Sequence, residues 1–143
     1  MNARIALSGF AAVLALALAF PAFASEPASK EEQRLALLNA HAGEPVTRVK
    51  FLRPLHSYEM VGPLNVLVWE TPTRAWLLDL RKSDACQYLD REFKISIDTL
   101  TDSINSTNGY VRARGGQICR IDRLREVDVK AWKDAERQAG IRK

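Results

Sequence analysis

The densest apolar stretch beyond the first two dozen residues spans residues 64–80. It reads LNVLVWETPTRAWLLDL, two β-branched and aromatic runs joined at a proline, a pattern typical of a β-hairpin. A three-residue turn around the proline places Val68 opposite Trp76 and Glu70 opposite Arg74. The other face is apolar as well, with side chains at Leu67, Trp69, Ala75 and Leu77. Because neither face is polar, we expect the hairpin to lie centrally with both faces covered.

Two helices are predicted at opposite ends of the remaining chain. Ser29 and Glu32 form a capping box at the start of the first, and Gly43 ends it. Asp128 caps the second, which Gly140 ends. The apolar stripe of the second helix is predicted at Val129, Trp132, Ala135 and Ala139.

Short alternating segments between the helices predict strands at residues 46–53, 56–61, 93–97, 110–114 and 117–123. Residues 99–108 are rich in Ser, Thr, Asn and Asp and predict a loop. A turn at Gly115 and Gly116 directs Val111, Ala113, Cys119 and Ile121 inward. With the central hairpin this gives an α+β fold, a bent or barrel-like antiparallel sheet of about seven short strands with an N-terminal and a C-terminal helix. We expect one helix to cover the face that carries Trp69 and Leu77.

The chain starts with a segment typical of a signal peptide. Arg4 precedes an apolar run at residues 5–20, and Ala22-Phe23-Ala24 fits the small-residue rule for cleavage. We therefore expect residues 1–24 to be removed and residues 25–143 to form a single disulfide-stabilised domain with no transmembrane segment. The expected location is periplasmic or secreted.

Export makes the only two cysteines, Cys86 and Cys119, the expected disulfide. A redox-active pair more often shows Cys-x-x-Cys spacing, which this chain lacks. The closed loop should stabilise the fold by about 3–4 kcal/mol on the chain-entropy model.

Charge is unevenly distributed along the chain. From Gly109 onward there are ten basic and five acidic residues, while residues 25–108 are slightly acidic. The outward side of the last hairpin and the following residues supply the predicted binding residues Arg112, Arg114, Arg120, Arg123 and Lys130. The expected partner is an anionic envelope surface or an envelope protein. A solvated face that serves solubility is the alternative, and nucleic acid is not expected because the nearby aromatic residues are better used in the core.

Three motifs resemble those of the proteobacterial domain-of-unknown-function family 6491. They are Val-Leu-Val-Trp followed after a proline turn by Arg-Ala-Trp-Leu-Leu-Asp-Leu, then Gly-Gly-Gln-Ile-Cys-Arg-Ile, then Val-Asp-Val-Lys-Ala. The resemblance covers essentially all of the chain after the leader. It implies a bacterial envelope protein and supplies no catalytic or ligand-binding residues.

No residue pattern predicts catalysis, a metal or a cofactor. Only two histidines occur, without metal-ligand spacing, and His56-Ser57 lacks a nucleophile elbow. We therefore expect a non-enzymatic domain. One alternative is a small-ligand pocket in the bent sheet lined by Tyr58, Met60 and Trp76; a weaker one is a hydrolase that uses Asp79 or Glu59. Asp79 faces Asn65 in the hairpin and must find a hydrogen-bond donor if it is buried.

Overall fold

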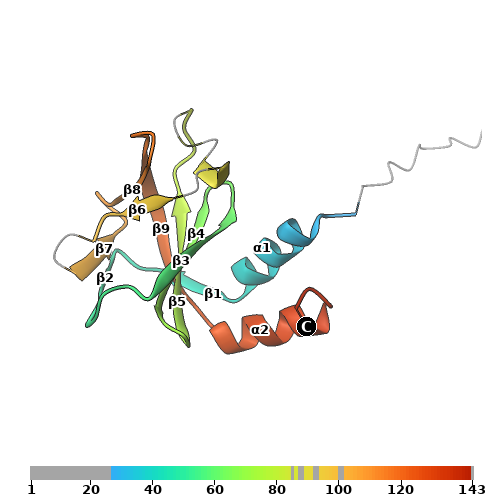
Figure 1. The fold of residues 1–143 in the computed structure, drawn as a ribbon. Coiled ribbons are helices and arrows are strands. Elements are labelled where there is room, and N and C mark those ends of the chain that lie inside the picture. Colours follow the sequence, from blue (N-terminus) through green and yellow to red (C-terminus); the bar gives the residue numbers. More distant parts are fainter. Residues whose placement is uncertain (1–26, 85, 87–88, 92–93, 100–101, 143) are drawn as a thin grey trace, which may run out of the picture.

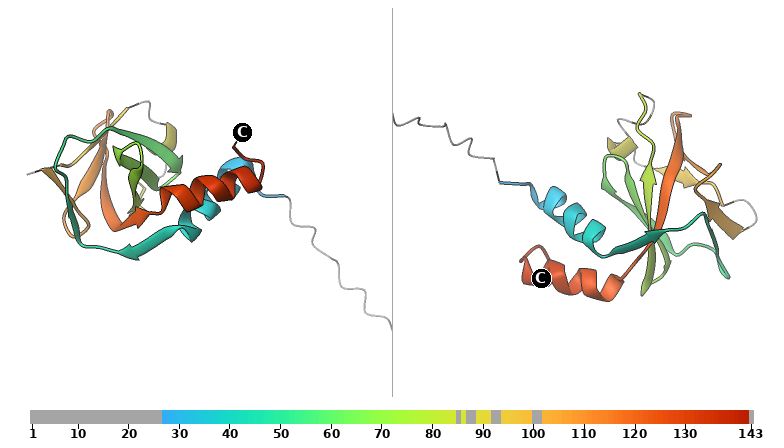
Figure 2. Two further views of the ribbon diagram at one scale, coloured as in Figure 1. Left: turned by 90° about the horizontal axis from the view of Figure 1, so that it is seen from below. Right: turned by 180° about the vertical axis from the view of Figure 1, so that it is seen from behind.

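In the computed structural model, a curled antiparallel sheet carries two helices on one side (Figure 1). The structure describes residues 27–84, 86, 89–91, 94–99 and 102–142. The helices α1 (Lys30–Ala40) and α2 (Val129–Gln138) come from opposite ends of the chain and lie next to each other (Figure 2). This is the predicted α+β fold. The expected leader, residues 1–24, lies outside the described residues.

Both helices begin where the sequence predicts, because a side chain caps each first turn. Ser29 Oγ accepts a hydrogen bond from the Glu32 amide at 3.2 Å, and the Glu32 carboxylate accepts one from the Ser29 amide at 2.8 Å. Asp128 Oδ1 accepts a hydrogen bond from the Ala131 amide at 3.0 Å. The predicted stripe of α2 is wrong at its end, since Ala139 is exposed.

Nine strands lie between the helices in the described part of the chain. They are β1 (Ala42–Pro45), β2 (Arg48–Lys50), β3 (Ser57–Gly62), β4 (Asn65–Thr71), β5 (Arg74–Leu80), β6 (Ile95–Ile97), β7 (Ser103–Asn105), β8 (Tyr110–Ala113) and β9 (Ile118–Val127). A 3₁₀ turn, η1 (Leu89–Arg91), precedes β6. The main sheet has seven strands in the order β3-β4-β5-β9-β8-β6, with β1 also beside β9, and β2 pairs with β7 separately.

The central hairpin consists of β4 and β5. Val68 lies opposite Trp76, as predicted. Arg74 lies opposite Thr71 rather than Glu70, because the register of the two strands shifts next to the turn. The predicted ion pair between Glu70 and Arg74 still forms, at 3.5 Å.

The two faces of this hairpin belong to two separate cores, so the prediction that both are covered is confirmed. The core inside the curl includes Val66, Val68, Trp76, Leu78, Ile95, Val111, Cys119 and Leu124. The core under the helices includes Leu38, Leu67, Ala75, Leu77, Val127 and Trp132. Both helices, rather than the one expected, cover this second face.

Strand β9 contributes side chains to both cores, and its register with β5 shifts by one residue. The partner of Asp79 is Arg123. The partner of the next residue, Leu80, is Ile121, and Asp122 is the extra residue. An extra residue reverses which side chains face inward along the rest of a strand. The second half of β9 therefore presents arginine side chains to the helices.

Two predictions from the polar segments were wrong. Residues 46–53 contain only the three-residue strand β2, and residues 99–108 contain the strand β7 in place of a continuous loop. Val49 of β2 lies opposite Ile104 of β7, and both side chains are buried in the core inside the curl. An isolated apolar residue in a polar segment can form a strand when a distant segment supplies its partner.

Candidate functional site

The candidate site lies on the outer side of β6, β8 and β9, on the part of the sheet away from the helices. Val111 pairs with Cys119, and both side chains point into the core. Ala113 and Ile121 are buried there too, as predicted. Because side chains alternate along a strand, the residues between them point outward.

A disulfide fixes the inner side of this region. Cys86 and Cys119 are bonded, with their Cα atoms 5.6 Å apart, and both are fully buried. The predicted pairing is confirmed. The bond attaches the segment before β6 to β9, directly beneath the outward residues of the site.

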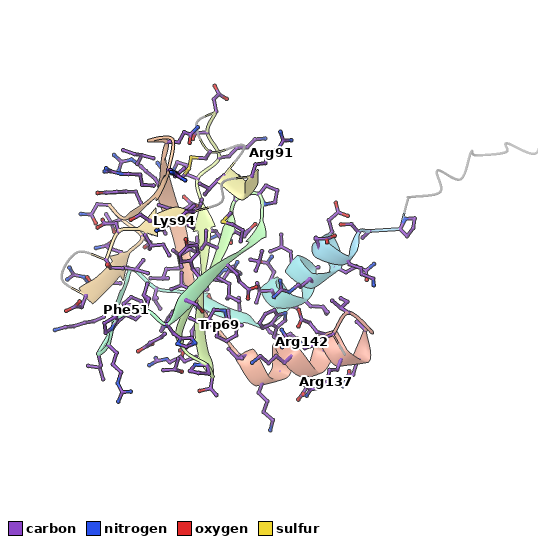
Figure 3. The ribbon with its side chains drawn as sticks, viewed as in Figure 1. Phe51, Trp69, Arg91, Lys94, Arg137 and Arg142 are labelled. Atoms are coloured by element: carbon purple, nitrogen blue, oxygen red, sulfur yellow. A yellow bond between two sulfur atoms is a disulfide. The ribbon has the colours of Figure 1, made fainter. Side chains whose placement is uncertain are left out.

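Four cations form what we call the basic face: Lys94, Arg112, Arg114 and Arg120. Lys94, Arg112 and Arg114 line a hollow of about 270 Å³ along β6 and β8. The guanidinium of Arg112 lies 5.5 Å from the ring centroid of Tyr110, and Arg120 is the cross-strand partner of that tyrosine. The label of Lys94 in Figure 3 marks this part of the sheet.

The basic face differs from most other arginines of the described chain in its ion pairing, although Arg48 and Arg53 likewise have no carboxylate partner there. None of its four cations forms an ion pair with a carboxylate among the described residues. Arginines that do form such pairs are Arg34, Arg74, Arg81, Arg123, Arg125, Arg137 and Arg142. Asp98 lies at the margin of the face, where it lines a second hollow together with Arg112.

The structure divides the predicted binding set. Arg112, Arg114 and Arg120 lie together, but Arg123 is drawn to Asp79, with 3.2 Å between Nε and Oδ2. Lys130 lies on α2, far from β6 and β8 (Figure 1). Lys94 belongs to the face although the sequence did not single it out, because only the pairing of β6 with β8 brings it beside the arginines.

Asp79 is the centre of a polar cluster between the sheet and α1. Its Oδ1 accepts a hydrogen bond from Asn65 Nδ2 at 2.7 Å, and its Oδ2 accepts one from Arg125 at 2.8 Å. The same guanidinium group donates to Asn39 Oδ1 at 2.6 Å. The predicted contact with Asn65 is confirmed, and the buried carboxylate has the donors that it needs.

A second buried carboxylate, Glu136, lies between the helices. Arg34 and Arg142 donate to its two oxygens at 3.0 and 2.9 Å, and the Glu136 side chain is only 1% exposed. Both guanidinium groups also lie over the ring of Trp132, at 5.3 and 5.7 Å from its centroid. In Figure 3 the label of Arg142 lies between the two helices. The burial of this glutamate was not predicted from the sequence, although its place seven residues after Val129 puts both on the same face of the helix.

Burial lowers the pKa of Arg34, but the charges and hydrogen bonds of Glu59 and Glu136 outweigh burial, so this pKa is raised above its usual value. Arg34 lies 3.1 Å from Glu59, whose other oxygen accepts a hydrogen bond from the indole of Trp69 at 3.3 Å. The cluster thus joins α1, α2 and β3 and is structural in character.

The two alternative sites are not assembled as expected. Tyr58 lines a hollow at the edge of β6, Met60 lines a different one beside α1, and Trp76 is buried in the core with its indole donating to Glu70. Glu59 and Asp79, the carboxylates of the hydrolase alternative, are each held by arginines. Neither carboxylate lines the hollows beside β6, β8 and α1.

Among the described residues, no group of three or more His, Cys, Asp or Glu side chains is placed to hold a metal ion. His41 is instead the C-terminal cap of α1. Within the same residues, neither helix has the length and hydropathy that crossing a bilayer requires.

Comparison with known proteins places nearly the whole chain in one family. Neither a curated protein nor a solved structure matches it. A family model matches residues 4–143, which includes every residue of the basic face, both cysteines and both helices. The chain belongs to the family of unknown function DUF6491.

Proposed function

We propose that this protein is an exported, non-enzymatic domain that binds acidic lipid head groups of the bacterial envelope through the basic face. The observation that carries the proposal is the contrast between Lys94, Arg112, Arg114 and Arg120 and the arginines that are paired with carboxylates elsewhere. Unpaired cations gathered on one rigid surface attract anions without first breaking an ion pair.

The rigidity of the surface supports the same proposal. Val111, Ala113 and Cys119 are almost completely buried beneath the basic face, and the disulfide anchors it from inside. Arg112 and Arg120 lie on the strands β8 and β9, and Lys94 and Arg114 directly adjoin the strands β6 and β8. Side chains on strands held in this way are better fixed than side chains on a loop.

Export and a periplasmic or secreted location remain part of the proposal. The signal-peptide pattern of residues 1–24 supports export, and so does a disulfide, which persists mainly in oxidising compartments. The absence of catalysis is supported by Glu59 and Asp79, because both carboxylates take part in structural ion pairs.

The test is sedimentation of the protein, without its leader, with vesicles of phosphatidylglycerol and phosphatidylcholine at low and high salt. We expect binding to the anionic vesicles that weakens as salt screens the charges. The variant Arg112→Ser/Arg114→Ser/Arg120→Ser should bind about 100-fold more weakly, at about 1 kcal/mol for each basic residue near an anionic membrane. Its melting temperature should change little, because all three side chains are exposed.

The matched control removes three charges from the helices, Lys30→Ser/Lys130→Ser/Arg137→Ser, and should bind as the original protein does. An equal loss of vesicle binding in both variants would show that binding depends only on the net charge of the protein and would refute the role of the basic face. Binding that persists in the first variant would refute the role of the basic face. Failure to bind vesicles at all, together with salt-sensitive capture of an acidic envelope protein, would assign the face to a protein partner instead.

A further inference from the structure

The two edges of the curled sheet approach each other at a seam between β3 and β6. These strands are the first and last in the order of the main sheet. A hydrogen bond from the Ile95 amide to Tyr58 Oη, 3.2 Å long, links them across the seam. The hydroxyl of a side chain, rather than a ladder of backbone bonds, therefore spans this edge.

A hollow of about 380 Å³ lies at the seam, within the usual range for small-molecule sites. Its apolar lining comes from Phe51, Leu55, Tyr58, Ile95 and Ile97. Phe51 and Ile95 are nearly completely buried and belong to the core inside the curl, whereas Tyr58 is 39% exposed. The hollow thus extends from solvent to the core of the sheet.

Cations lie around this apolar hollow. Arg53 and Lys94 line it, and neither forms an ion pair with a carboxylate in the described part of the chain. Asp102 is the acidic residue of the lining. An apolar interior with two cations and one carboxylate favours a ligand that has an apolar body and an anionic end.

The seam hollow adjoins the basic face. Lys94, Ile95 and Ser96 line both the seam hollow and the hollow that Arg112 and Arg114 line. One ligand can therefore place its apolar part at the seam while its charge lies next to Lys94.

We infer that the seam hollow binds the acyl chain of a single-chain anionic amphiphile, such as a fatty acid, whose acidic group lies at Lys94 and Arg53. The inference rests on the proposed function, since Lys94 belongs to the basic face, and it names the class of anion. Apolar contact supplies affinity in proportion to chain length, and the cations distinguish an acid from a neutral head group.

The test is calorimetric titration of the disulfide-bonded protein with butanoate, hexanoate, octanoate and decanoate below their aggregation concentrations. Affinity should rise about fourfold for each CH₂ that enters the hollow, about 200-fold from butanoate to octanoate if all four are buried. Decyl maltoside, which has a neutral head group, should bind more weakly than decanoate. Arg53→Met/Lys94→Met should remove that difference between head groups, because both cations of the lining are then absent.

Two tryptophan substitutions in the segment between β2 and β3 test where the acyl chain binds. Leu55→Trp fills the hollow and should abolish the dependence on chain length. Leu52→Trp is the matched control and should leave it unchanged, because Leu52 is 92% exposed and does not line the hollow. Amide NMR shifts of the unmodified protein provide a readout that no substitution disturbs. Decanoate should shift the amides of residues 53, 55–58 and 94–97.

The outcomes separate this inference from the proposed function. Anionic vesicle binding with no dependence on chain length, or with decanoate shifts confined to residues 110–120, would overturn the seam site and leave the proposed function standing. Chain-dependent binding that survives Arg112→Ser/Arg114→Ser/Arg120→Ser supports the seam site, because these arginines do not line it. Failure of both vesicles and decanoate to bind would overturn both.

Discussion

Asp79 on β5 and Arg125 on β9 form a buried ion pair, with 2.8 Å between the carboxylate and the guanidinium group. Only 8% and 10% of the two side chains are exposed. Because Arg125 also donates to Asn39, the pair attaches α1 to the sheet. Asp79, which the sequence suggested as the acid of a hydrolase, therefore helps to hold α1 on the sheet.

Replacement of this carboxylate should be strongly destabilising. In Asp79→Ala the Arg125 guanidinium stays buried without its carboxylate, and loss of one partner of a buried pair costs about 3–5 kcal/mol. Urea unfolding followed by circular dichroism measures this. Arg123→Ala is the matched control, since Arg123 pairs with the same carboxylate but is half-exposed. It should cost about 1 kcal/mol or less, and equal losses in both variants would contradict the central role of the pair with Arg125.

The disulfide should supply a large share of the stability. Its two cysteines are separated by 33 positions, and on the chain-entropy model a loop of this size contributes about 3–4 kcal/mol. Cys86→Ala/Cys119→Ala should therefore lower the free energy of unfolding by that amount in urea titrations. A reducing agent should destabilise the original protein and leave the double variant unaffected. An unchanged midpoint on reduction would show that the bond constrains the unfolded chain very little.

Replacement of the buried Glu136 should cost more stability than replacement of Glu59, which is partly exposed. Glu136→Ala removes the shared acceptor of Arg34 and Arg142 and should cost about 2–4 kcal/mol. Glu59→Ala removes the other acceptor of Arg34 at a partly exposed position and should cost about 1 kcal/mol or less. Thermal unfolding of the two variants compares them directly. A larger loss in Glu59→Ala would reverse the assigned order.

The cap of α2 gives a smaller, local prediction. Asp128→Ala leaves the Ala131 amide without its acceptor and should cost about 1 kcal/mol. Asp134→Ala removes an acidic residue from an exposed pair with Arg137 on the same helix and should cost about 0.5 kcal/mol or less. Denaturant titration resolves the difference, and equal effects would indicate a general charge effect rather than a cap.

Local patterns in the sequence were sufficient for much of the fold. Ser29 and Asp128 act within one helical turn, and the alternation in β4 and β5 fixes which residues face each core. Alternation along β8 and β9 likewise predicted that the side chains of Arg112 and Arg120 point outward. In each case the residues that interact are close in the sequence or alternate regularly, so their pattern predicts their contacts.

Features that depend on distant partners were not predictable. Ile104 forms a strand because Val49 lies opposite, and Lys94 joins the basic face because β6 pairs with β8. Glu136 is buried although the predicted stripe of α2 continued through Ala135 and Ala139, because Arg34 from the other end of the chain neutralises it. A local sequence pattern does not reveal which distant residue will be the partner.

Strand β9 cannot open from one apolar interior without disturbing the other. Cys119, Ile121 and Leu124 belong to the core inside the curl and Val127 to the core under the helices, and the same backbone pairs with three other strands. Separation of either interior from β9 therefore breaks backbone hydrogen bonds of the strand that supports the other. Amide protons along this strand should consequently exchange with deuterated water only through global unfolding, and more slowly than those of any edge strand.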